Sequence, residues 1–185
     1  QSTIPGANLF LMNPAGVLFG PNASLNVSGS VTITTADYLR LGETVRFNAI
    51  PGAEDALLSA APVAAFGFIN NSPAPITVQG SLLRVPITSD PDTGQPVGHA
   101  LSLVGGDITV AADPLTGTPG NLSAPSGQIN LASVASAGEI LSPSLQSGTN
   151  VTMGTVRLQE FAMLDVSDTL LEGDGHAGMV RIRSG

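Results

Sequence analysis

Residues 100–110, ALSLVGGDITV, contain the unit that decides the fold of this chain. Apolar residues lie two apart on both sides of a Gly-Gly pair, and side chains two apart point to the same face of a strand. These residues are Leu101, Leu103, Ile108 and Val110. The stretch therefore predicts two strands of three to five residues, joined by a tight corner, that turn one apolar face toward a narrow core.

The same unit recurs along the chain. The further copies run from Leu25-x-Val27 to Val31-x-Ile33, from Ile76-x-Val78 to Leu82-Leu83-x-Val85, from Leu122 to Ile129-x-Leu131, and from Met163-Leu164-x-Val166 to Met179-Val180-x-Ile182. The corner glycines Gly29, Gly80, Gly106 and Gly127 are 51, 26 and 21 residues apart. The two shorter spacings match the ~20–29 residues of one solenoid rung, and the longest can hold two rungs or one rung with an excursion.

These repeats favour an all-β fold, a right-handed parallel β-helix of about 7–9 rungs that occupies residues 1–185 as a single domain. An antiparallel sandwich is the competing architecture. Its hairpins prefer Asn-Gly or Asp-Gly turns between longer strands. No Asn-Gly occurs here, and the one Asp-Gly lies in a polar stretch at Asp174-Gly175.

Residues 43–75 are rich in Pro and Ala and are expected to leave the β-helix as an excursion. Within them, residues 53–68 (AEDALLSAAPVAAFGF) have the chain's only helical composition, and Pro62 interrupts it. Because proline breaks a helix interior, we expect a helical turn or two at most.

Composition limits the classes of partner. The formal charge is −8, all six cations are Arg, and there is no Lys and no Cys. An acidic chain lacks the basic surface that binds nucleic acid or anionic lipid, so both partners are disfavoured. The absence of Cys excludes disulfides and thiolate metal sites. No apolar run approaches the ~18–20 residues of a membrane helix, so we expect no membrane insertion.

Asn13-Pro14-Ala15-Gly16 forms the sharpest turn signal, between two apolar runs in residues 8–20, NLFLMNPAGVLFG. Pro14 fixes φ at the second turn position, Gly16 allows a positive φ, and the Asn13 side chain can bond back onto the turn. We expect Val17 to begin the next strand with its side chain in the core.

Residues 7–42, ANLFLMNPAGVLFGPNASLNVSGSVTITTADYLRLG, closely resemble the haemagglutination-activity domain, or two-partner secretion domain, of filamentous haemagglutinin-like exoproteins. That family carries an Asn-Pro-Asn-Gly-(Ile/Val) motif in the same strand–turn–strand context. Here Ala15 replaces the second Asn of the motif. Residues 100–110, 121–136 and 178–185 are similar to later rungs of the family.

The resemblance implies a secreted β-helical adhesin at the outer surface of a Gram-negative-type bacterium, exported through an outer-membrane TpsB-type transporter. It implies that Asn13, Pro14, Gly16 and Val17 form a transporter-recognition motif, and that extended surfaces bind a host or neighbouring-cell surface protein or carbohydrate. The family's domain begins well upstream of this motif, so we expect the chain to be a fragment of a longer β-helical protein. No enzymatic activity, metal or cofactor is expected.

Two other functions stay open. A self-assembling extracellular fibre would stack copies end to end, and a carbohydrate-active enzyme would need converging carboxylates and a base. The acidic residues are scattered, and Asp90-Pro-Asp92-Thr-Gly94, the best metal candidate, lacks the downstream Glu of a calcium loop and is expected to be a plain loop. His99 and His176 share no ligand spacing. Arg181 and Arg183 lie two apart and are expected on a solvated outer face.

Overall fold

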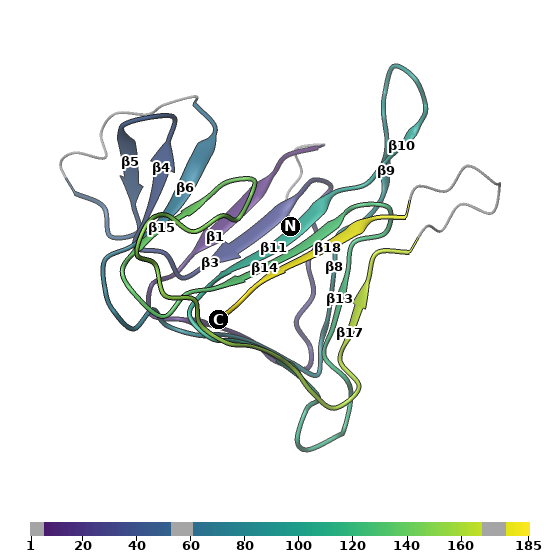
Figure 1. Ribbon diagram of the computed structural model, residues 1–185. Coiled ribbons are helices and arrows are strands. Elements are labelled where there is room, and N and C mark those ends of the chain that lie inside the picture. The colour runs from purple at the N-terminus through teal and green to yellow at the C-terminus, as the bar shows by residue number, and fades with distance from the viewer. Residues whose placement is uncertain (1–5, 53–60, 168–176) are drawn as a thin grey trace.

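The computed structural model describes residues 6–52, 61–167 and 177–185, which contain β-strands and no helix (Figure 1). The first parallel sheet has the order β1 (Leu9–Met12), β3 (Val31–Thr34), β11 (Ala100–Gly105), β14 (Gln128–Ser133), β18 (Met179–Arg183). The second is β2 (Val17–Phe19), β7 (Ile76–Gln79), β12 (Ile108–Ala111), β16 (Val156–Leu158). The third is β8 (Leu82–Arg84), β13 (Asn121–Ser123), β17 (Met163–Asp165). The all-β prediction is confirmed, and these three sheets are parallel rather than sandwich-like.

The chain passes through the three sheets in a fixed order, for example from β11 to β12 to β13 and back to the first sheet at β14. Figure 1 shows the sheets along the sides of a roughly triangular cross-section. In the first sheet, Val31 pairs in register with Leu9, 22 residues earlier, and Ile129 pairs with Leu101, 28 residues earlier. Both spacings agree with the one-rung repeat expected from the corner glycines.

Side chains that alternate along these strands meet in one apolar core. Ile33, Leu103 and Leu131 pair in register on neighbouring strands and are fully buried. Residues of the second and third sheets, such as Ile108 and Leu122, are also fully buried in this cluster. Each short strand with apolar residues two apart therefore contributes one layer of the core.

The corner glycines are required because the backbones of neighbouring corners approach closely. A Cβ at Gly127 would overlap the backbone of His99, and a Cβ at Gly106 would overlap the carbonyl of Pro73. Both contacts are with backbone, which cannot move aside as a flexible side chain can. The tight corners that the sequence predicts are thus also the points where only a residue without a side chain fits.

A separate antiparallel sheet lies on the outer face of the first parallel sheet. Its order is β15 (Gly138–Leu141), β6 (Val63–Phe68), β4 (Tyr38–Leu41), β5 (Val45–Asn48). A second apolar cluster joins the two layers, in which Phe66 and Ile140 of the antiparallel sheet pack with Val104 and Ala132. This side sheet covers part of the first parallel sheet.

Two expectations need correction. The described part of residues 43–75 contains strands of the side sheet, and the helical turn expected over 53–68 is a strand from Val63 onward, while residues 53–60 lie outside the described residues. Seven to nine rungs are more than the described residues form, since the largest parallel sheet among them has five strands. The side sheet and a hairpin of β9 (Thr88–Ser89) and β10 (Pro96–Val97) lie outside the three parallel sheets.

Candidate functional site

The Asn13 turn connects β1 to β2 at the corner between the first and second parallel sheets. The Gly16 amide donates to the Asn13 carbonyl at 3.1 Å, which closes a β-turn over Pro14 and Ala15. The Asn13 side chain closes it twice more: its Oδ1 accepts from the Ala15 amide at 3.1 Å, and its Nδ2 donates to the Gly16 carbonyl at 3.0 Å. Gly16 has φ +106°, as the sequence predicts.

The turn is held on the next rung by the backbone. The Asn13 amide donates to the Thr34 carbonyl at 3.0 Å, and the Val17 amide donates to the Pro75 carbonyl at 3.1 Å. A Cβ at Gly16 would lie 3.2 Å from that same Pro75 oxygen and 3.5 Å from the Ala74 Cβ. Gly16 is therefore fixed both by its dihedral angle and by the close approach of the rung below.

That lower rung is itself fastened at the corner. The buried Thr35 hydroxyl donates to the Ala74 carbonyl at 2.7 Å, which joins the two ends of the excursion where it leaves and re-enters the stack. The Gly106 amide donates to the Ala74 carbonyl at 3.0 Å and to Thr35 Oγ1 at 3.2 Å. Sequence reasoning missed Thr35, Ala74 and Pro75 as supports of the turn, because no motif in residues 35–75 indicates that its ends meet.

The turn has a solvent-exposed part and a part that is anchored in the structure. Asn13 and Ala15 are exposed, Pro14 and Gly16 are half-buried, and Val17 packs against the main core. The four residues singled out from the sequence thus form one continuous corner. Its exposed rim consists of a locked Asn side chain and a small Ala side chain, a rigid surface available for contact.

The Asp90 loop is the tip of the β9–β10 hairpin. Asp90 Oδ1 accepts from the amide and hydroxyl of Thr93 at 2.8 and 3.0 Å and from the Asp92 amide at 3.0 Å. The Thr93 hydrogen bonds lower the pKa of Asp90 below its ordinary value. Within residues 6–52, 61–167 and 177–185, no three His, Cys, Asp or Glu side chains are grouped to hold a metal ion.

Asp113, Asp165 and His99 also serve local structure. Hydrogen bonds from Thr116 and Ser167 lower the pKa of Asp113 and Asp165, respectively. His99 shares a 2.7 Å hydrogen bond between its Nε2 and Thr88 Oγ1, and burial lowers the pKa of its imidazole. His176 lies outside the described residues. These groups act as caps of turns and loops.

Comparison with known proteins gives one match. The family model of the TPS secretion domain matches residues 2–180, nearly the whole chain. No curated protein and no solved structure matches the chain significantly. None of the described segments is a helix of the length and apolarity that would cross a bilayer. The match covers the Asn13 corner and the three parallel sheets, apart from residues 181–183 at the end of β18. From it we conclude that the chain belongs to the TPS secretion domain family, whose members are two-partner secretion exoproteins, secreted across the outer membrane with a TpsB transporter and not known as enzymes.

Proposed function

We propose that the Asn13–Val17 corner is the part of this exoprotein that its TpsB-type transporter contacts during export. The observation that carries the proposal is the combination of an exposed rim and a locked backbone. Three hydrogen bonds within the turn fix the positions of Asn13 and Ala15, so little conformational entropy is lost when a partner binds. Family membership indicates a TpsB-type transporter as the partner, and the corner presents a preorganised surface to that partner.

We further propose that the chain winds as a right-handed parallel β-helix. The fixed order of the three sheets and the parallel register of every neighbouring strand in them support this winding. Connections between parallel strands of one sheet are right-handed in about 98% of cases, which supports the handedness. The exposed outer faces of such a rod, which carry polar side chains and apolar ones such as Leu18 and Leu82, are suited to binding a protein or carbohydrate on another cell surface, without a catalytic step.

Self-assembly end to end is a second candidate function, and it has its own observation. On β1, Leu9 and Leu11 are 41% and 42% exposed, and on β18, Val180 and Ile182 are 39% and 42% exposed. Their register partners on inner strands are fully buried, so a further rung would bury these side chains too. Sedimentation velocity over a range of concentrations tests the idea, and a monomer at every concentration removes it.

The transporter proposal is tested by export of surface variants that leave the turn closed. Ala15→Glu changes the exposed rim but keeps the Ala15 amide that donates to Asn13. Leu115→Glu is the matched control, because Leu115 is 92% exposed in the loop between β12 and β13. We expect Ala15→Glu to reduce the secreted amount and Leu115→Glu to leave it unchanged. Equal export of both variants and the wild type would refute the assignment.

A further inference from the structure

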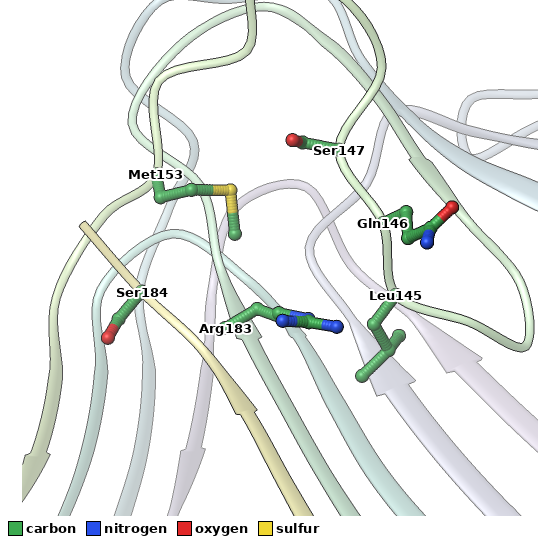
Figure 2. A pocket seen from close by; sticks show the side chains of 6 residues that line it. All are labelled: Leu145, Gln146, Ser147, Met153, Arg183 and Ser184. Atoms are coloured by element: carbon green, nitrogen blue, oxygen red, sulfur yellow. The ribbon is translucent and has the colours of Figure 1, made fainter.

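A hollow of about 380 Å³ lies beside the last strand of the first sheet, away from the Asn13 corner (Figure 2). It is lined by Leu145, Gln146, Ser147, Met153, Arg183 and Ser184. Figure 2 shows the Arg183 side chain extending from β18 toward Leu145, with Gln146 and Ser147 further along the same loop and Met153 on the other side. The size falls in the range of sites for small organic ligands.

Arg183 differs from the residues that pair with it in register across the first sheet, which form one column of side chains. Its register partner is Ala132, which pairs in turn with Val104 and then Thr34, and all three of these are fully buried beneath the side sheet. The chain thus places a guanidinium at the point where the column emerges from under that sheet. Among the described residues, Arg183 makes no hydrogen bond, ion pair or ring contact.

The surroundings leave that positive charge unneutralised. No acidic residue lines the hollow, whereas Arg40 is paired with Glu139 at 3.0 Å and Arg181 donates to the Pro143 carbonyl at 2.9 Å. The Gln146 amide and the Ser147 and Ser184 hydroxyls supply further hydrogen-bond donors. The hollow therefore presents one cation and several neutral donors, without an internal anion.

The wall opposite Arg183 is a closed loop. The Leu141 amide donates to the Gln146 carbonyl at 2.8 Å, the Leu145 amide donates to the Leu141 carbonyl at 2.8 Å, and Ser147 bridges to Ile140. Leu145 has φ +56° and is buried in the second core, which leaves Gln146 and Ser147 exposed beside the hollow. The backbone that carries Gln146 and Ser147 is thus fixed before a ligand arrives.

We propose that this hollow binds a carboxylate carried on a small organic molecule. The planar fork of Arg183 matches the two oxygens of a carboxylate, the neutral donors suit further oxygens, and Met153 provides an apolar contact for the ligand body. A monoanion fits better than a dianion, because one guanidinium neutralises one charge and the chain as a whole carries −8. The site is independent of the Asn13 corner and of any transporter.

The test is titration of the ¹⁵N-arginine-labelled chain with four probes, read by NMR at the Arg side-chain Nε–Hε signals. Glucuronate and N-acetylalanine carry the carboxylate on a sugar and on a peptide unit, and glucose and inorganic sulfate are the neutral and dianionic controls. The spectrum of Arg183→Lys identifies the Arg183 signal by its loss. We expect at least one carboxylate to shift that signal with a Kd of about 1 mM, as a few charge-assisted hydrogen bonds allow.

Variants then separate a site from general charge. Arg183→Gln should weaken carboxylate binding at least ~10-fold in calorimetry, while Arg157→Gln, an exposed Arg on β16, should leave it within about twofold. Glucose should produce no shift, and the tighter carboxylate identifies the sugar or the peptide as the better source. The proposal is overturned if neither carboxylate shifts the Arg183 signal of the wild type, if sulfate binds as tightly as the carboxylates, or if Arg157→Gln weakens binding equally.

Discussion

Replacing Gly16 by Ala should lower the free energy of unfolding by about 1–3 kcal/mol. Gly16 has φ +106°, where a residue with a side chain is strained by an amount of this order. The added Cβ would also lie 3.2 Å from the Pro75 carbonyl oxygen, a backbone atom that is held by the Val17 amide. Because the strain lies in the folded chain, the variant should unfold at lower urea concentration with an unchanged m-value.

Gly20→Ala is the matched control, four residues further along the chain and just after the end of β2. A Cβ at Gly20 has no heavy atom within 4 Å, and its φ is not positive. We expect Gly20→Ala to leave stability unchanged or to raise it by up to about 1 kcal/mol through the unfolded chain. If Gly16→Ala unfolds at the same urea concentration as Gly20→Ala, the corner is not strained and the description of the turn is wrong.

Three further perturbations follow from the packing and the pKa shifts. Leu103→Ala, in the middle of the main core, should cost about 2–5 kcal/mol in urea unfolding, and a cost under 1 kcal/mol would contradict its full burial. Tyr38 is the only Tyr in the sequence, and its pKa is raised first by burial and then by its hydrogen bond to Glu139. Glu139→Ala should therefore lower the pKa of Tyr38 in an absorbance titration, and an unmoved pKa would exclude that contact. Burial lowers the pKa of His99, so the contribution of neutral His99 to stability is complete above its ordinary pKa of about 6.5 and is lost as pH falls below that value. His99→Gln should flatten this part of the curve of stability against pH, and an identical curve would show that His99 is not desolvated.

The parallel core could be predicted from the sequence because its signal is local. Period-two apolar residues and corner glycines set the inward face and the bends, so β11, β12 and β14 lie where the pattern places them. The side sheet was not predictable in this way. Its partner strands β6 and β15 are about 70 residues apart in the chain, and their pairing depends on a shared apolar cluster rather than on any turn signal.

In the candidate site, too, the local geometry could be predicted and the long-range contacts could not. The geometry of the Asn13 turn follows from Asn, Pro and Gly at fixed offsets, and the structure bears out the hydrogen bonds and the positive φ of Gly16. Its support by Thr35 and Pro75 comes from a rung that closes across a 40-residue excursion. Arg183 is exposed, as its expected place on an outer face predicts, whereas the hollow beside it depends on the loop after β15, which lies beside β18.

The most direct measurement is calorimetric binding of the purified chain to the isolated periplasmic domains of its TpsB-type transporter. Wild type, Ala15→Glu and Leu115→Glu are compared after urea unfolding has shown equal stability. If the Asn13 corner is the contact, Ala15→Glu binds at least ~10-fold more weakly, a loss of about 1.4 kcal/mol, and Leu115→Glu binds as the wild type does. Equal affinity of all three chains would contradict the central claim that this corner is recognised.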